Sequence, residues 1–326
     1  MKPEKILVTG GAGYIGSHVV HELCDQGYDV TIMDNMSSGV EINIDPRTKF
    51  IEGDLLVKAD LEKTFAVNPQ VVFHFAAFKA AGESMIYPEK YAHNNICGTL
   101  NLLNKMAEKG SRAMVFSSSA AVYGDPKYLP IDEKHTLQPV NYYGYTKLAI
   151  EENLKWYSQL KGIRFAALRY FNATGYDLKG RILGKEPNPA NLSPIVMEVA
   201  CAMRDKMQLF GDDYDTDDGT CIRDYIHVND LSTAHLKAMK YIIAENKDLI
   251  INLGTGKGQS VLEVIKAAEK VTGNPIDYII TERRAGDPAK LYADAKKASE
   301  LLDWQTEYSD LQTIFESMKK VYFPKT

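Results

Sequence analysis

Short apolar runs alternate with stretches of helical periodicity along much of the chain. Seven runs predict buried strands, at residues 6–9, 29–33, 49–52, 71–75, 113–116, 163–168 and 249–253. Helical patterns lie between several of these runs, most clearly at residues 14–26, 89–109 and 143–160. Because strands that alternate with helices build βαβ units, the pattern predicts an α/β fold with a doubly wound parallel sheet.

The regular alternation fades after Asn172. Loops rich in proline and acidic residues follow, such as residues 185–189 and 211–213. We therefore expect residues 1–172 to form the sheet domain and residues 173–326 to form mainly a smaller C-terminal lobe. The strand near residues 249–254 is expected to return to the first sheet, so the boundary is not a single cut.

The composition argues against several classes of protein. The 326 residues are 45% hydrophobic, enough for a large core, and the net charge of −5 disfavours a broad nucleic-acid surface. The longest apolar stretch, residues 71–78, is too short to span a bilayer, and the N-terminus shows no signal pattern. The four cysteines form no CxxC pair, which indicates reduced thiols and a cytoplasmic protein.

A glycine-rich turn follows the first predicted strand and opens the first predicted helix. It contains overlapping GxGxxG and GxxGxxG patterns, built on Gly10, Gly11, Gly13 and Gly16. Glycines allow a tight turn and a close backbone approach to a pyrophosphate, and the helix N-terminus supplies free N–H groups. The turn therefore predicts a dinucleotide site of the Rossmann type.

Asp34 indicates which dinucleotide binds. It ends the second predicted strand, 18 residues after Gly16, where a carboxylate can accept hydrogen bonds from ribose hydroxyls. The same carboxylate would repel a 2′-phosphate, and residues 35–39 offer no Lys or Arg to offset that repulsion. The sequence therefore favours NAD over NADP.

A tyrosine and a lysine four residues apart form the second candidate site. The spacing occurs four times, as Tyr123/Lys127, Tyr143/Lys147, Tyr157/Lys161 and Tyr292/Lys296. Gly124 and Pro126 interrupt the first pair, so a regular helix should not contain it. The third pair lies near the end of its helix, and the fourth is remote in sequence from the cofactor strands. Tyr143/Lys147 opens the helix after the fifth strand, so this pair is the candidate.

Ser119 completes a catalytic trio with that pair. The fifth predicted strand runs into Ser117, Ser118 and Ser119, and ligands of doubly wound sheets bind beyond the carboxyl ends of the strands. An unperturbed tyrosine has a pKa near 10, but the charge of Lys147 and of an oxidised nicotinamide would favour the phenolate. Tyr143 could then remove a proton from a substrate hydroxyl while carbon gives hydride to NAD.

At this level of detail the sequence resembles the extended short-chain dehydrogenase/reductase family. The resemblance rests on residues 9–16, 117–124 and 143–147, and it is narrowed by residues 169–172, 218–220, 223–228 and 283–287. It runs from about residue 5 to about residue 304, which is nearly the whole chain. It implies an isomerase that interconverts UDP-galactose and UDP-glucose by transient oxidation at C4 with tightly bound NAD. The ketopyranose would then rotate, and the hydride would return to it.

The resemblance also implies residue roles. Besides the glycines, Asp34, Tyr143 and Lys147, it assigns cofactor contacts to Tyr14, Ile15, Asn35, Asp54, Leu55, Phe75, Ala76, Ala77, Lys79, Asn94, Ser117 and Phe171. Besides Ser119, it assigns UDP-sugar contacts to Asn172, Asn191, Leu192, Phe210, Arg223, Arg284, Asp287 and Leu291. Arg223 and Arg284 suit a diphosphate clamp, because guanidinium offers several donors and a fixed charge.

Two alternative activities remain open at this stage. A sugar-nucleotide 4,6-dehydratase needs an added acid and base, which related enzymes supply as an Asp-Glu pair just after the fifth strand. Here Ala120 and Ala121 follow Ser119, with no carboxylate. A non-enzymatic NAD-sensing protein is the other alternative, although such a protein can dispense with the tyrosine and lysine that this chain retains.

Three further expectations concern specificity, metals and assembly. Leu291 stands where relatives restricted to glucose and galactose often carry a tyrosine, which predicts some activity on UDP-N-acetylhexosamines. His18, His21 and Cys24 share a face of the first helix, but that helix serves the pyrophosphate turn and no fourth ligand is evident, so no metal site is expected. The helices at 89–109 and 143–160 build a dimer interface in the resembling family, which predicts a homodimer.

Overall fold

The computed structural model describes residues 5–187, 189–284 and 287–324. The chain divides into two compact units, each assembled from three segments. Unit 1 comprises residues 1–124, 137–169 and 232–251, and unit 2 comprises residues 125–136, 170–231 and 252–326.

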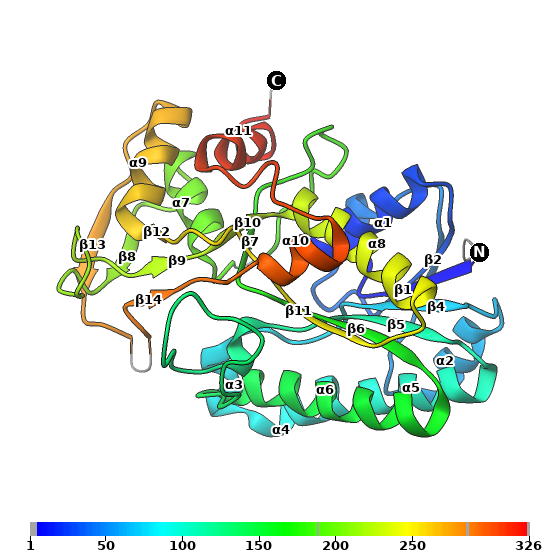
Figure 1. The fold of residues 1–326 in the computed structure, drawn as a ribbon. Helices are drawn as coiled ribbons and strands as arrows, with labels where there is room; N and C mark the ends of the chain where they lie inside the picture. The colour runs from blue at the N-terminus through cyan, green and yellow to red at the C-terminus, as the bar shows by residue number, and fades with distance from the viewer. Residues whose placement is uncertain (1–4, 188, 285–286, 325–326) are drawn as a thin grey trace. The chain divides into compact units, whose positions relative to one another are not determined.

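A sheet of seven strands forms the centre of unit 1 (Figure 1). The strands are β1 (Lys5–Thr9), β2 (Asp29–Asp34), β3 (Lys49–Glu52), β4 (Val71–His74), β5 (Ala113–Ser117), β6 (Arg164–Tyr170) and β11 (Leu249–Leu253). Their order is β11-β6-β5-β4-β1-β2-β3, and the pairs from β6 to β3 are parallel. The predicted doubly wound sheet is therefore confirmed. The chain order reverses between β1 and β4, the place where such sheets bind ligands.

Helices cover both faces of this sheet. α1 (Tyr14–Asp25) and α8 (Val228–Ala244) lie on one face, and α2 (Lys58–Phe65), α5 (Gly98–Lys109) and α6 (Tyr142–Lys161) lie on the other (Figure 1). Apolar side chains of β1, β4 and β5 pack against α2, α5 and α6 in one buried cluster. The helices α5 and α6 end at Gly110 and Gly162, whose φ angles of 74° and 69° suit glycine.

The segment between β4 and β5 departs from one regular helix. The sequence pattern predicts a helix over residues 89–109, but the structure has α3 (Ala81–Ile86), α4 (Pro88–Tyr91), a π-helical segment η2 (Ala92–Cys97) and then α5. The wider π turn places the side chain of Asn95, which is fully buried, against the chain at Phe78. Such π segments occur often at functional sites, and this one flanks the switch point of the sheet.

Unit 2 is built from small sheets and helices. Its strands are β7 (Asn172–Thr174), β8 (Met207–Phe210), β9 (Ile222–Arg223), β10 (Tyr225–His227), β12 (Gln259–Ser260), β13 (Tyr278–Thr281) and β14 (Lys290–Leu291). They pair as β10-β7, β12-β9-β14 and β13-β8. Its helices include α7 (Leu192–Ala200), α9 (Val261–Thr272), α10 (Lys296–Leu302) and α11 (Leu311–Tyr322). A capping box between Ser260 and Glu263 starts α9.

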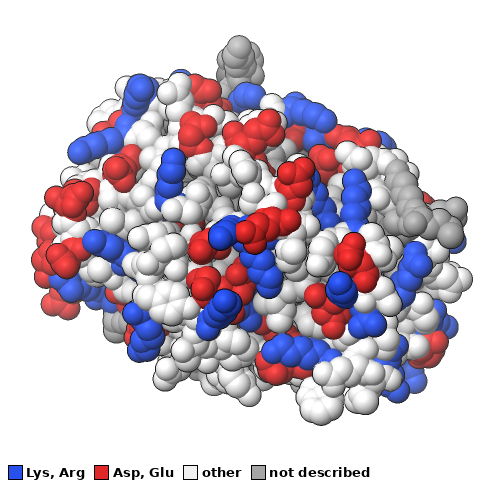
Figure 2. Space-filling model, viewed as in Figure 1, with Lys and Arg blue, Asp and Glu red and all other residues white. Residues whose placement is uncertain are grey.

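The surface carries charges of both signs. Acidic and basic side chains are interspersed over the face shown in Figure 2. Across the part of the chain that the structure describes, no helix is long and apolar enough to cross a membrane.

Candidate active site

The turn between β1 and α1 depends on two glycines. Gly10 has a φ of 74°, and its N–H donates to the carbonyl of Met33 over 2.9 Å. A Cβ at Gly10 would lie 2.5 Å from the amide nitrogen of Ala76, and a Cβ at Gly16 would lie 2.1 Å from the Gly10 carbonyl oxygen. Side chains at these positions would therefore push the turn away from β4 and unwind the start of α1.

The amino end of α1 fits a pyrophosphate. Gly13 is the N-cap residue, no side chain caps the helix, and its first turn holds no acidic residue. A Cβ at Gly13 would meet only the Gly10 carbonyl oxygen within 4 Å, so the space above it is open. The positive end of the helix dipole, with no acidic side chain beside it, therefore favours an anion at this end of α1.

Asp34 lies beside this turn and supports it. Its carboxylate accepts the N–H of Ala12 and the N–H of Met36, each over 3.0 Å, and the residue is 8% exposed. Burial raises the pKa of Asp34, and the two backbone hydrogen bonds lower it. The sequence predicted the ribose contact but not this second role in holding the glycine turn.

The other predicted cofactor residues cluster at the ends of β2, β3 and β4. Asn35 donates to the Asp54 carboxylate over 2.9 Å, and the centre of the Phe75 ring lies 5.0 Å from that of the His235 ring. The side chain of Leu55 is buried in the apolar core, so only its main chain could face an adenine ring. The remaining members follow β4 or lie in η2 or at the end of β5: Ala76, Ala77, Lys79, Asn94 and Ser117.

The predicted catalytic trio of Ser119, Tyr143 and Lys147 lies where β5 meets the start of α6. The Nζ of Lys147 donates to the Ser117 carbonyl over 2.8 Å, and the Ser119 side chain is hydrogen-bonded to Tyr143. Asn141 caps α6 by accepting the N–H of Gly144 over 2.8 Å, which fixes where the helix begins. The structure thus brings together the three residues that the sequence selected.

Burial acts on both titrating groups of the trio. It raises the pKa of Tyr143, against the hydrogen bond from Ser119, and it lowers the pKa of Lys147 to about 7, against the charge of Glu151. The Lys147 Nζ lies 5.8 Å from the centre of the Tyr143 ring and 4.9 Å from that of Phe116. The two groups are therefore close enough for the protonation of one to influence the other.

The rejected candidates have other structural settings. Tyr123 follows the short η3 helix (Ala120–Val122), and Tyr292 precedes α10, so neither begins a regular helical turn with its lysine. Tyr157 donates to Asn104 over 2.6 Å. On α1, His18 bonds to the Tyr14 carbonyl and His21 to the Asp45 carboxylate. Within the described ranges no group of three His, Cys, Asp or Glu side chains could hold a metal ion.

Two polar clusters in unit 2 contain predicted substrate residues. Arg223 pairs with the Asp287 carboxylate over 3.0 Å, and Leu291 lies opposite Arg223 in the β14-β9 ladder. The guanidinium of Arg284 lies 3.9 Å from the centre of the Phe210 ring. Cys221 interacts electrostatically with Arg223, Arg284 and Asp287, so the two clusters are neighbours.

The remaining predicted residues of unit 2 lie at element ends. Asn172 begins β7, where both its N–H and its side-chain amide donate to the Asp224 carbonyl. Phe171 directly precedes it and is half-buried. Asn191 is the exposed N-cap residue of α7, and Leu192 is the first residue of that helix.

Three buried polar residues, Asp224 of unit 2 and Asn95 and Glu151 of unit 1, were not predicted from the sequence. The buried Asp224 accepts the N–H and hydroxyl of Thr255 and the N–H of Ala293. The buried Asn95 bonds to Phe78, and the buried Glu151 bonds to Arg169. Each makes its contacts across at least 15 positions of sequence, which no local pattern reveals.

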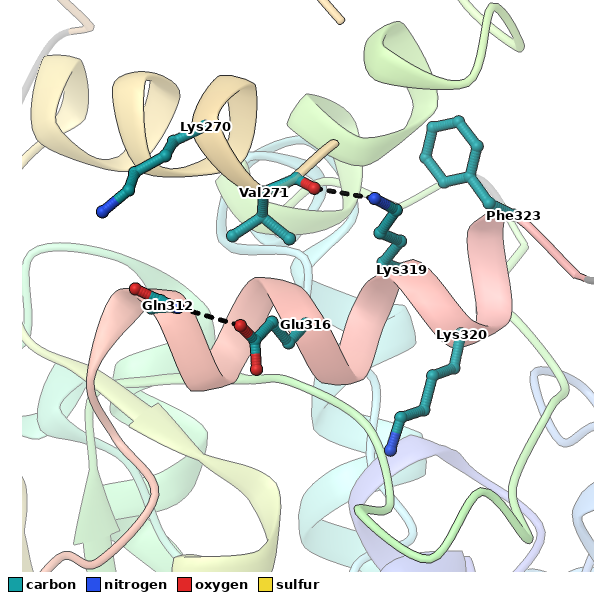
Figure 3. Close-up of a pocket in the computed structure, with 7 residues that line it drawn as sticks. All are labelled: Lys270, Val271, Gln312, Glu316, Lys319, Lys320 and Phe323. Atoms are coloured by element: carbon teal, nitrogen blue, oxygen red, sulfur yellow. Dashed lines mark hydrogen bonds between the residues drawn. The ribbon is translucent and has the colours of Figure 1, made fainter. Parts of the chain in front are cut away.

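A separate cavity of about 590 Å³ lies in unit 2 between α9 and α11 (Figure 3). Two of its lysines have backbone partners, since Lys319 donates to the Val271 carbonyl and Lys320 to the Leu178 carbonyl. None of the residues that line it belongs to the predicted site.

The chain is similar to known sugar-nucleotide epimerases in both sequence and fold. The UDP-glucose 4-epimerase of Halalkalibacterium halodurans is 46% identical over 95% of this chain and 93% of its own. The crystal structure of UDP-glucose 4-epimerase from Brucella ovis in complex with NAD superposes with a TM-score of 0.93 at 43% identity, over 96% of this chain and 97% of that one. The structure of the UDP-Glc/GlcNAc 4-epimerase of Campylobacter jejuni superposes with a TM-score of 0.86 at 40% identity, over 99% of this chain and 100% of that one. Residues 6–254 match the model of the NAD dependent epimerase/dehydratase family, and the chain belongs to that family.

Proposed function

We propose that this chain interconverts UDP-galactose and UDP-glucose by reversible oxidation at C4 of the sugar. The observation that carries the proposal is the trio at the end of β5, where Ser119 bonds to Tyr143 and Lys147 lies one helical turn further on. That trio lies at the carboxyl ends of the strands of a doubly wound sheet, at the same edge as the glycine turn and with β4 between them. Relatives named for this activity align over nearly the whole chain.

In this mechanism the chain's own residues handle the proton. Tyr143 accepts the proton of the 4′-hydroxyl, Ser119 donates a hydrogen bond to the same oxygen, and the charge of Lys147 favours the phenolate. The chemistry that bound NAD would supply is reversible hydride transfer at C4, with return to the other face of the ring. Because the cofactor is regenerated in each cycle, it need not leave the protein.

Unit 2 is proposed to hold the nucleotide while the sugar turns. Arg223 and Arg284 suit the diphosphate, and their present partners, Asp287 and Phe210, orient the two guanidinium groups. Anchoring at the diphosphate leaves the ketopyranose free to present its other face.

The dehydratase alternative is not favoured. Elimination of water across C5 and C6 needs an additional acid and base, and the η3 segment after Ser119 contributes two alanines and a valine. A non-enzymatic NAD binder would not need the buried lysine and its carbonyl partner, which this chain retains.

We also propose a homodimer assembled through α6 and α3. Tyr145, Trp156 and Leu160 are 50%, 60% and 69% exposed, and their spacing places them along one side of α6. Met85 and Ile86 of α3 are 61% and 69% exposed. Association would remove these exposed apolar side chains from water, which is favourable.

We propose that the protein works in the cytoplasm. The free thiols, including the exposed Cys97, suit that reducing compartment.

The first prediction tests the trio. Tyr143→Phe removes the hydroxyl and keeps the ring, so turnover of UDP-galactose to UDP-glucose, with no added cofactor, should fall by a factor of about a hundred or more while NAD stays bound. Tyr157→Phe on the same helix is the matched control and should keep its activity. Near-normal turnover by Tyr143→Phe would show that another group is the base, and a 4-keto-6-deoxy product would support the dehydratase.

The second prediction concerns Asp34. Asp34→Ala removes a charged acceptor whose two ribose hydrogen bonds are each worth about 1.5–3 kcal/mol, so the purified protein should carry less NAD and discriminate less against NADP. The nucleotide released on denaturation measures the first effect, and calorimetric titration with each nucleotide measures the second. Asp29→Ala, exposed at the other end of β2, is the control. Equal NAD content in the two variants would show that Asp34 does not bind the cofactor.

The third prediction concerns the sugar pocket. Leu291 is smaller than tyrosine and lies opposite Arg223 in the ladder, so we expect conversion of UDP-N-acetylglucosamine alongside the glucose reaction. Leu291→Tyr should suppress the N-acetyl activity, because overpacking costs about 1–3 kcal/mol, and should spare the glucose activity. Leu301→Tyr on α10 is the control. If the wild type lacks N-acetyl activity, or Leu291→Tyr retains it, Leu291 is not the gate.

The fourth prediction concerns assembly. Trp156→Glu places a charge in the proposed interface, so the protein should shift from dimer to monomer in light scattering coupled to size-exclusion chromatography. Ile280→Glu changes a comparably exposed apolar residue on β13 and should leave the mass unchanged. A wild-type monomer, or a Trp156→Glu dimer of unaltered stability, would contradict the proposed interface.

A further inference from the structure

Three consecutive serines at the end of β5 bond to three successive turns of α6. The carbonyl of Ser117 accepts Lys147, the hydroxyl of Ser118 donates to Glu151 over 2.5 Å, and Ser119 bonds to Tyr143. Positions 143, 147 and 151 recur every four residues, so they share one side of the helix. The middle serine therefore links the catalytic pair to a residue that touches neither substrate nor cofactor in the proposed mechanism.

Glu151 is one half of a fully buried ion pair. Arg169 donates to its two carboxylate oxygens through Nε over 2.9 Å and through a terminal nitrogen over 2.5 Å. The side chains are 0% and 2% exposed, and Arg169 also donates to the Tyr123 hydroxyl over 3.0 Å. Burying two charges costs several kcal/mol per ion before their attraction is counted, and apolar residues often replace such pairs without loss of stability. The cost of burying this pair therefore indicates that it has a role besides packing.

Other titratable groups around the catalytic pair are neutral or lie near the surface. On β4, His74 bonds to Thr9 and Thr99, and burial together with the charge of Lys147 lowers its pKa to about 3. Tyr91 of α4 faces Tyr143 and donates to Glu83, which also pairs with the exposed Lys90. The buried charges nearest Lys147 along this side of α6 are thus those of Glu151 and Arg169.

We propose that Glu151 and Arg169 are positioning residues that fix the Ser117–Ser119 segment against α6 and, through their opposite charges, set the pH at which the Tyr143–Lys147 pair becomes a base. The proposal rests on the proposed roles of Tyr143 and Lys147. In it, Glu151 opposes the loss of the Lys147 proton that burial promotes, and Arg169 holds both carboxylate oxygens of Glu151 in place.

The sign of each effect follows from charge. The base-competent form of the pair has lost one proton, so an added positive charge favours it and an added negative charge disfavours it. Glu151→Gln leaves Arg169 unopposed, which should move the acid limb of the pH profile of kcat to lower pH. Arg169→Met leaves the carboxylate unopposed, which should move the limb to higher pH. We expect about one pH unit in each direction.

The test measures kcat for UDP-galactose against pH in the NAD-loaded wild type, Glu151→Gln, Arg169→Met and the double variant. The double variant restores charge balance, so its acid limb should return toward that of the wild type even where kcat is reduced. Arg169→Lys keeps the charge and should leave the limb in place. The ionisation of Tyr143 can also be followed without turnover, from the tyrosinate absorbance that is lost when Tyr143→Phe is added to the same protein. This measurement replaces kcat for any variant with little activity.

The outcomes separate the possibilities. Opposite shifts of the two single variants support the proposal. Shifts in the same direction, or losses of kcat and thermal stability with an unmoved limb, assign the pair a purely structural role and overturn it. If one single variant does not fold, the other single variant and the double variant still decide, because a structural role predicts no difference between their acid limbs. If Tyr143→Phe itself keeps its activity, the proposed base is wrong instead.

Discussion

The burial of the Lys147 amine against the end of β5 is the constraint on which the rest of unit 1 depends. A buried ammonium group needs an acceptor and an opposing charge, and the fold supplies the Ser117 carbonyl and Glu151. Glu151, buried in turn, needs donors, and Ser118 and Arg169 provide them. These contacts fix α6 to β5 and so fix the position of Tyr143. The parallel sheet contributes by bringing the ends of β1, β4 and β5 to one edge.

A buried carboxylate organises unit 2 in a comparable way. Asp224 accepts three hydrogen bonds from Thr255 and Ala293, while its own carbonyl accepts Asn172. Its neighbour Arg223 is thereby held on β9, beside β14. A Cβ at Gly254 would lie 2.5 Å from the Asp224 carboxylate, so this arrangement also explains a glycine that no turn pattern requires. The residues proposed for the nucleotide are thus placed by a group that need not touch it.

The sequence was informative wherever the physics is local. All seven predicted strands are present within two residues of their expected bounds, because a buried parallel strand needs a continuous apolar run. The glycine turn and the choice among the Tyr/Lys pairs also followed from neighbouring residues. The π turn at residues 92–97 did not, because the pairing of Asn95 with Phe78 that accompanies it spans 17 positions. For the same reason no local pattern indicates the pairing of Glu151 with Arg169, which spans 18 positions.

The proposed division of labour also bears on how specificity can change. Leu291, the proposed sugar gate, is paired in register with Arg223, so a change of side chain there occurs on the same ladder as the proposed diphosphate clamp. The trio proposed to handle the proton is assembled from α6 and the segment that ends β5, by contacts that lie wholly within unit 1. A substitution at the proposed gate, Leu291, would therefore leave the hydrogen bonds that position Tyr143 in place. That separation is physically consistent with relatives of one fold being named for glucose-type and for N-acetylated sugars.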